Sequence, residues 1–281
     1  MSNPFFNEKK MRDDANGWAA PTSATAVASK PQGFPQETDS PLNRPMNDGP
    51  SSRYQSEVMT VNGVITATIV LFVIFLVAAS IGWFTSTTNV EGDFQPAPGI
   101  LIGVVVGFAA VMAAYFKPRW AKFLGPVYAL CYGYAVGAIS SLYENSQNGI
   151  VLQAAGATFA VFIVMLTLYR TGVIKVTPRF RKIVIGATMG VMLLYVVSFV
   201  INIFGGSIGF INEPSLIGIG FSILVCGLAA SNLALDFDLI ERGTEMKMSK
   251  DYEWVAALGL VVTIVWLYLE ILRLLSKLNR R

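Results

Sequence analysis

The chain has 281 residues, of which 53% are hydrophobic and only 14% charged, and its formal net charge is +3. Charged residues make up about a quarter of an ordinary soluble domain, so this composition excludes that class and indicates a membrane protein. The chain contains no His, which argues against a zinc site or a Ser/His/Asp triad, and nothing in its charge pattern suggests a nucleic-acid partner.

The first 56 residues are predicted to be a disordered tail. They are rich in Pro, Ser, Asn, Asp and Gly, and such a segment cannot bury enough apolar surface to offset the entropy lost on ordering. The tail begins with charged residues instead of a short apolar core and a cleavage site, so we do not expect a secretory signal peptide. Residues 57–281 are predicted to form one transmembrane domain.

Seven apolar runs follow the tail, and each has a length suited to crossing a bilayer, for which about 20 residues are needed. The sequence therefore predicts an all-α, polytopic helical bundle. The third run is the weakest, because it contains several Tyr and Gly residues, and six spans would remain if it were re-entrant. The runs are residues 61–84, 99–116, 121–142, 150–168, 183–204, 216–240 and 254–275.

Basic residues near the ends of spans favour the cytoplasmic side of a membrane. The loops after the second, fourth and sixth spans contain Lys and Arg, whereas those after the first, third and fifth contain only acidic charges. This alternation predicts a cytoplasmic N-terminus and an outside C-terminus. Arg273, Lys277, Arg280 and Arg281 then lie outside, so either the last span does not cross fully or the many internal charges override them.

Small residues repeat at every fourth position on three of the spans. Such faces let transmembrane helices approach closely, and we interpret them as packing surfaces. They comprise Gly99, Gly103 and Gly107 on the second span, Gly133 and Gly137 on the third, and Gly186 and Gly190 on the fifth. Cys131 and Cys226 each lie inside an apolar stretch and are interpreted as small packing residues, not as a disulfide framework.

Ionisable side chains inside a membrane are costly, which makes them candidates for function. The sixth span carries Asp236, which shares a helical face with Asn232, and Asp238, which faces elsewhere. We expect Asp238 to pair with Arg242 or with the basic residues 179–182. For Asp236 the sequence leaves pairing, simple burial and a functional role open.

The last span carries Glu270 and Arg273, three residues apart, a spacing that allows an ion pair. The helical rise places Glu270 about 14 Å from Asp236 along the membrane normal, so we expect no direct contact between these carboxylates. The stretch of the last span nearest in height to Asp236 is residues 262–264, which includes Thr263.

A carboxylate that changes its charge with pH can act as a gate inside a membrane. Asp236, Glu270 and Thr263 are the candidate gate or proton-sensing residues, and Arg273 and Asp238 are the candidate latch or charge partners. Oxygen ligands suit Ca²⁺, and a permeation pathway needs only weak binding. Asp236 is therefore a candidate for transient binding of a permeant Ca²⁺, and no other cofactor is expected.

Two segments resemble the Bax inhibitor-1-like family, also called the transmembrane Bax inhibitor motif family. The first is the third-span stretch Tyr128-Ala-Leu-Cys-Tyr132-Gly133-Tyr-Ala-Val-Gly137-Ala-Ile-Ser. The second is the Asp-bearing end of the sixth span, followed by a final helix that ends Ile271-Leu-Arg273-Leu-Leu. Together with the seven-span pattern and the tail, they look like the bacterial branch with an extended N-terminus.

The resemblance implies a central last helix surrounded by six others, and a proton-sensitive calcium leak controlled by two aspartates on the last two spans. Asp236 matches the first aspartate. Aligning the chain ends puts Thr263 at the second position, whereas matching Leu-Tyr-Leu-acid puts Glu270 there. Where the family has Glu-Gly on the third span, this chain has Tyr132-Gly133. The bacterial resemblance also implies the cell membrane.

Two functional hypotheses follow. The first is a pH-modulated leak channel for cations, Ca²⁺ foremost, with a gate that includes Asp236. The second is a non-conducting membrane protein that binds and modulates other membrane proteins, including proteases. An intramembrane hydrolase, and enzyme activity in general, is not expected, because no nucleophile with a base is recognisable. The expected partners are the lipid bilayer and, under the second hypothesis, other membrane proteins.

Overall fold

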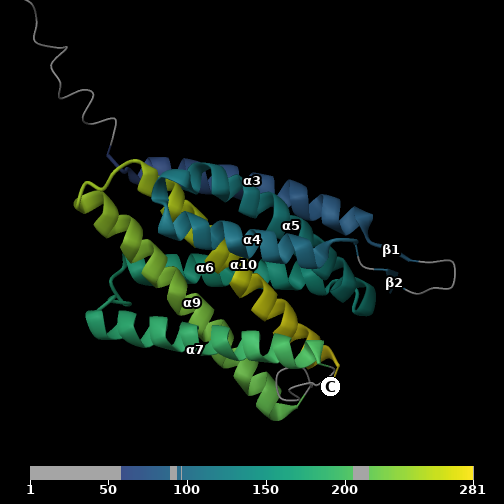
Figure 1. Ribbon diagram of the computed structural model, residues 1–281. Coiled ribbons are helices and arrows are strands. Elements are labelled where there is room, and N and C mark those ends of the chain that lie inside the picture. Colours follow the sequence, from purple (N-terminus) through teal and green to yellow (C-terminus); the bar gives the residue numbers. More distant parts are fainter. Residues whose placement is uncertain (1–57, 89–93, 96, 205–214, 281) are drawn as a thin grey trace, which may run out of the picture. The chain divides into compact units, whose positions relative to one another are not determined.

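The computed structural model describes residues 58–88, 94–95, 97–204 and 215–280, so the predicted tail lies outside the described residues. The described chain is an all-α, polytopic membrane bundle (Figure 1). Its elements are α3 (Val61–Thr85), β1 (Thr87–Thr88), β2 (Phe94–Gln95), α4 (Ile100–Phe116), the 3₁₀ turn η2 (Pro118–Trp120), α5 (Ala121–Ser146), α6 (Ile150–Arg170), α7 (Pro178–Ile203), α9 (Leu216–Glu245) and α10 (Asp251–Asn279).

Each α-helix coincides with one predicted apolar run, and hydroxyl side chains mark where two of them begin. The Thr60 hydroxyl accepts a hydrogen bond from the Gly63 N–H at 3.0 Å and caps α3. The Ser215 hydroxyl accepts from the Gly218 N–H at 3.0 Å and caps α9. These caps satisfy N–H groups that the first helical turn leaves without a partner.

Six of the described helical segments are long and apolar enough to cross a membrane. The third run is the least apolar of these six segments, as predicted, but it is not too short to cross, because η2 and α5 together form a helical segment of 29 residues. The seventh apolar helix, α4, is not among these six, because its 17 residues lie at the lower limit of length for a span. The Tyr and Gly residues of α5 are not signs of a re-entrant loop, because several of them, including Tyr128 and Gly133, are buried between helices.

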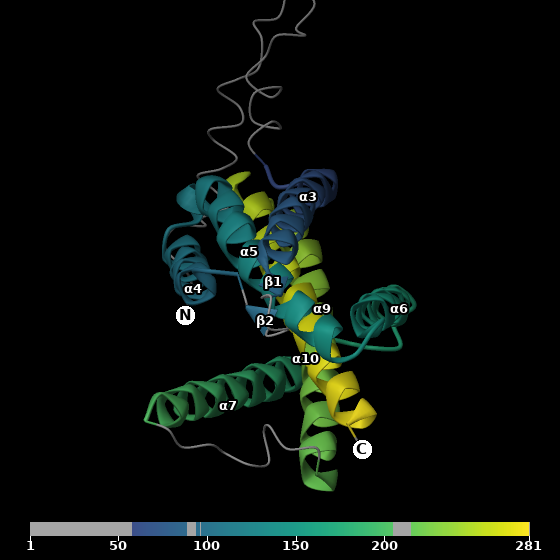
Figure 2. The same cartoon turned by 90° about the vertical axis from the view of Figure 1, so that its right-hand side faces the viewer.

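Helix α10 is the central element of the bundle. It packs against α3, α5, α6 and α9, and 61% of its apolar stretch is buried, the largest share among the six long helices. Helix α7 is the opposite case, with 11% buried, and it lies at the edge of the bundle against α9 (Figure 2). The arrangement agrees with the central last helix that the family resemblance implies.

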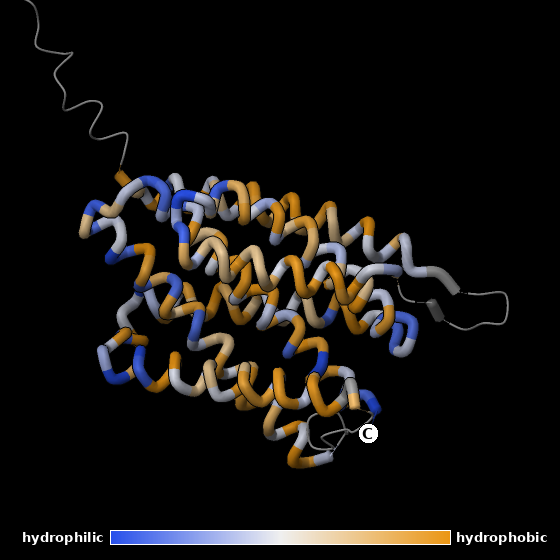
Figure 3. Tube along the Cα trace, in the orientation of Figure 1, coloured by the Kyte–Doolittle hydropathy of each residue, from blue (hydrophilic) through white to orange (hydrophobic). Residues whose placement is uncertain are grey.

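The outer faces of the helices are apolar, as expected for contact with lipid. Along α3, for example, Ile65, Ile69 and Val73 are exposed, whereas Ala67 and Leu71 are buried. Hydrophilic residues gather at the helix ends and in the loops (Figure 3). An apolar exterior of this extent is stable only in a bilayer, because soluble proteins rarely expose large apolar patches.

Glycines allow α5 to approach its neighbours closely. A Cβ added at Gly137 would lie 1.9 Å from the carbonyl oxygen of Ala79 on α3, and one at Gly133 would lie 2.7 Å from that of Phe75. From α4, a Cβ at Gly103 would lie 2.6 Å from the Cys131 carbonyl oxygen. Backbone atoms therefore touch at these crossings, which only small residues permit.

The remaining glycines of the predicted packing faces differ from one another. A Cβ added at Gly107 would lie 3.0 Å from Tyr132 Cβ, so this residue also packs closely. A Cβ at Gly186 or Gly190 would meet no atom within 4 Å among the described residues, and the prediction of a packing face on α7 was therefore wrong. Gly99 has a positive φ of 81° and begins α4 instead of packing against a neighbour.

The two ends of the bundle are named here by the chain segments that lie at them. The described loops after α4, α6 and α9 contain Lys and Arg and lie at the end where α3 begins, here called the N-terminal end. There the Met59 N–H donates to the Met248 carbonyl oxygen at 2.8 Å. The other end, where α9 begins and α10 finishes, is called the C-terminal end.

Gly137→Ala is expected to lower the free energy of unfolding by about 1–3 kcal/mol, because the added methyl group would push α3 and α5 apart. Denaturant titration of the purified protein in mixed micelles measures this. Gly156→Ala on α6 is the matched control, since its Cβ would meet no described atom within 4 Å. It should be neutral or slightly stabilising. Equal losses in both variants would contradict close packing at Gly137.

Candidate functional site: polar contacts inside the bundle

A stripe of polar residues follows one face of the central helix. Thr263, Trp266, Glu270, Arg273 and Lys277 are spaced three or four residues apart on α10, so their side chains share a face. Their side-chain hydrogen bonds to other helices are with α7 and α9. We call these five residues the α10 stripe.

Asp236 on α9 lies against the first residue of the stripe. Its carboxylate interacts with the Thr263 hydroxyl and lies 3.7 Å from where a Cβ would stand on Gly259. Thr263 also donates to the Gly259 carbonyl oxygen at 3.1 Å. The Oδ2 atom of Asp236 is buried and has no hydrogen-bond partner among the described residues. Buried polar atoms of this kind are rare in proteins, and an intramembrane carboxylate with such an atom is a candidate for function.

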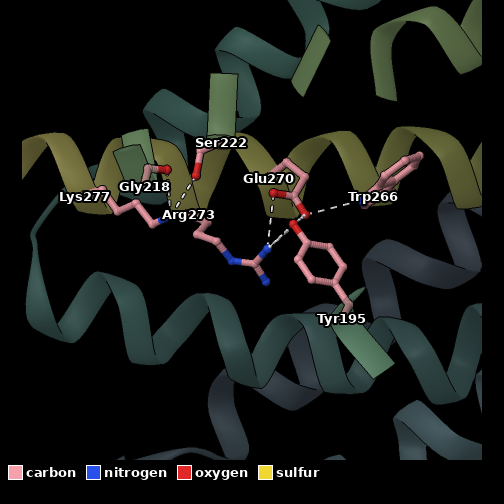
Figure 4. Close-up of polar contacts among 7 residues, drawn as sticks. All are labelled: Tyr195, Gly218, Ser222, Trp266, Glu270, Arg273 and Lys277. Atoms are coloured by element: carbon pink, nitrogen blue, oxygen red, sulfur yellow. Dashed lines mark hydrogen bonds and ion pairs between the residues drawn. The ribbon is translucent and has the colours of Figure 1, made fainter. Parts of the chain in front are cut away.

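Glu270 lies in a separate cluster in which every partner donates to it (Figure 4). Its Oε1 accepts from the Tyr195 hydroxyl at 2.8 Å, from the Trp266 indole at 3.3 Å and from Arg273 Nη1 at 3.0 Å. Arg273 Nη1 also reaches Oε2 at 3.2 Å. Glu270 is 1% exposed, and the Arg273 guanidinium balances its charge.

Tyr195 attaches the peripheral helix α7 to this cluster. Its hydroxyl accepts from Arg273 Nη1 at 2.8 Å while it donates to Glu270. The Arg273 guanidinium also lies 5.0 Å from the centre of the Tyr195 ring, within range of a cation–π contact. The Glu270–Arg273 pair therefore links α7 to α10 as well as neutralising itself.

Lys277 ends the stripe near the C-terminal end of α10. The residue is only 4% exposed. Its Nζ donates to the Ser222 hydroxyl at 2.8 Å and to the Gly218 carbonyl oxygen at 3.1 Å, both on α9 (Figure 4).

Asp238 takes part in ion pairs away from the stripe. It pairs with Arg181 at the start of α7 and accepts from Arg242 Nε on its own helix at 2.9 Å. The neighbouring Glu241 accepts from the Tyr169 hydroxyl of α6. These contacts fasten the C-terminal part of α9, which lies at the N-terminal end of the bundle, to α6 and α7.

The structure separates the candidate residues into three groups. Asp236 meets Thr263, as the helical-rise estimate predicted. Glu270 lies seven residues beyond Thr263 on α10, about 10 Å further along the helix axis at the helical rise, and it pairs with Arg273. Asp238 pairs with the basic residues expected for it. The alignment that places Thr263 opposite Asp236 is therefore the one that agrees with the geometry.

The sequence reading missed Tyr195, Trp266 and Lys277 as polar partners inside the bundle. For Trp266 and Lys277 a signal exists, because both lie at three- or four-residue intervals from Glu270 and Arg273. For Tyr195 there is none, because its contact depends on how α7 packs. Lys277 was also counted among the C-terminal charges expected to lie outside the membrane. In the structure it is buried between helices.

A bundle of long apolar helices around a central helix that carries buried polar side chains defines a multi-pass membrane protein. The chain belongs to the Bax inhibitor 1 like family, whose model matches residues 3–280. This match confirms the resemblance found on the third and last spans. No curated protein matches the chain.

Asp236→Asn and Asp238→Asn each remove one negative charge from α9, and we expect opposite outcomes. Asp236→Asn should leave the free energy of unfolding unchanged or raise it, because it removes a charge with an unpartnered oxygen. Asp238→Asn should lower it by about 1–3 kcal/mol, because Arg181 and Arg242 lose their charged partner. Denaturant titration compares the two, and a larger loss for Asp236→Asn would contradict these environments.

Arg273→Gln is expected to destabilise the bundle by about 3–5 kcal/mol, because Glu270 would remain buried without its counter-charge. The double variant Glu270→Gln/Arg273→Gln removes both charges and should be more stable than Arg273→Gln alone. The same titration, run as a double-mutant cycle, measures the coupling. Additive losses would show that the two charges do not depend on each other.

Proposed function

We propose that this protein is a pH-modulated cation leak, with Ca²⁺ as the foremost permeant ion, gated through Asp236. The observation that carries the proposal is the buried Oδ2 atom of Asp236, which has no partner among the described residues. Glu270 pairs with Arg273, and Asp238 pairs with Arg181 and Arg242, whereas no cation pairs with Asp236 among the described residues. Membership of the Bax inhibitor 1 like family supports this choice of function.

The gate follows from the cost of an unmatched charge. Ionised Asp236 in this enclosed arrangement has a hydroxyl beside it but no cation, which is unfavourable inside a membrane. A rearrangement that admits water or a cation to Oδ2 would relieve this cost. Ionisation of Asp236 therefore favours the conducting state, and protonation favours the enclosed one.

The proposed path runs along the α10 stripe from Asp236 toward the C-terminal end. One carboxylate and a hydroxyl are too few ligands for a tight Ca²⁺ site, but conduction requires only weak and transient binding. Arg273 acts in this proposal as the latch, because its pairing with Glu270 holds the middle of the path closed. Glu270 is then part of the latch and not of the proton sensor.

Thr263 gives the proposed gate a simple pH response. The residue that faces Asp236 is a hydroxyl and not a second carboxylate, so no proton is shared between two acids at this site. The flux should follow the ionisation of one group. We further propose that the N-terminal end faces the cytoplasm of a cell membrane, as the basic loops there favour, and that the chain catalyses no reaction.

The test is Ca²⁺ flux into proteoliposomes that contain the purified protein, scanned from acidic to alkaline pH. Wild type should show a flux that rises with pH along a single titration curve. Asp236→Asn cannot ionise and should give a low flux at every pH. Asp238→Asn, which removes a carboxylate two residues away, is the matched control and should keep the pH response.

Two results would overturn the proposal. One is a wild-type flux whose pH response survives Asp236→Asn, because the sensor would then lie elsewhere. The other is no flux above that of empty liposomes from protein shown to be folded, which would leave the non-conducting modulator of other membrane proteins as the better hypothesis.

A further inference from the structure

Lys277 carries a buried charge whose hydrogen-bond partners are both neutral. Its ammonium group donates to one hydroxyl and one backbone carbonyl, on Ser222 and Gly218. No carboxylate pairs with it in the part of the chain that the structure describes. Buried charges in proteins are ordinarily paired, so this arrangement is as unusual as that of Asp236.

The neighbouring charges of the stripe do not offset it. Glu270 is the acidic member of the stripe, and both of its oxygens accept from Arg273. Arg273 lies four residues before Lys277, on the same face, and has the same sign. The C-terminal half of the stripe therefore carries one net positive charge, and that charge is on Lys277.

We propose that Lys277 is an electrostatic barrier to cations at the C-terminal end of the path, an inference that rests on the proposed leak. A cation moving along the α10 stripe meets this ammonium group before it reaches Asp236. The group is held between α9 and α10 by two hydrogen bonds and does not swing freely in solvent. Its repulsion acts in a low-dielectric interior, where charges interact far more strongly than in water.

The location suits a permanent charge. Lys277 lies in the last turn of α10, where the helix dipole favours a positive group. A barrier at this point slows cation entry without altering the gate, because Thr263, which contacts Asp236, lies about four helical turns deeper on α10 at 5.4 Å per turn. Lys277 is therefore a residue that sets the rate and charge preference of permeation, separate from the pH sensor.

A barrier that acts through charge makes a prediction about valence. The repulsion energy is proportional to the charge of the ion, so its removal should speed a divalent cation by the square of the factor for a monovalent one. A variant that merely loosened the helices would show no such relation. The comparison of Ca²⁺ with K⁺ therefore separates an electrostatic role from a structural one.

The experiment measures Ca²⁺ and K⁺ flux through the same proteoliposomes for wild type, Lys277→Gln, Lys277→Arg and Arg280→Gln. Lys277→Gln keeps a polar group beside Ser222 and should raise Ca²⁺ flux at least about tenfold and K⁺ flux about threefold. Lys277→Arg keeps the charge and should behave as wild type. Arg280 is exposed near the same end, so Arg280→Gln controls for surface charge and should change little.

The outcomes separate this inference from the proposed function. If wild type conducts with the expected pH response and Lys277→Gln matches it, the barrier is refuted and the gate stands. Equal increases for Ca²⁺ and K⁺, or an equal effect of Arg280→Gln, also refute the barrier. Flux that appears only in Lys277→Gln supports a charge barrier at Lys277 but overturns the leak proposed for the wild type, and no flux from any folded variant overturns both.

Discussion

The enclosure of α10 by the other helices is the constraint on which the rest of the structure depends. A charge that faces lipid costs several kcal/mol or more, so ionisable groups within the spans require a surface that protein covers. α10 provides it, because α3, α5, α6 and α9 pack around it. Two charged residues of the stripe, Glu270 and Lys277, are buried on this covered surface. The enclosure in turn requires the close α3–α5 crossing, where Gly137 leaves no room for a side chain.

Hydropathy and helical spacing predicted much of this from the sequence. Apolar length alone located the seven helices, and counting the helical rise placed Thr263 beside Asp236 and kept Glu270 away from it. The basic residues near Asp238 were sufficient to predict its ion pairs. These inferences succeed because they concern one helix, or two helices whose relative height a short connecting loop fixes.

The failures concern contacts that depend on how helices rotate and pack. Gly186 and Gly190 have the same spacing as Gly133 and Gly137 but face no neighbour, so the motif identifies a smooth face without saying whether a helix covers it. Hydropathy correctly marked α5 as the least apolar of the six long helices, but it could not show that several of its Tyr and Gly residues are buried against protein. Tyr195 could not be assigned to Glu270 without the position of α7.

Helix α7 shows how polar contacts fix the position of a transmembrane helix. Its inward residues recur at intervals of three and four, and three of them make polar contacts: Arg181 with Asp238, Thr188 with Asn232 at 2.8 Å, and Tyr195 with Glu270 and Arg273. Burial of its apolar face adds little preference, because lipid solvates such a face as well as protein does. The place of α7 beside α9 and α10 therefore depends on these three contacts, and the one at Tyr195 requires that Glu270 and Arg273 remain paired. A change in that pair would alter the packing of α7 and the cover of the stripe together.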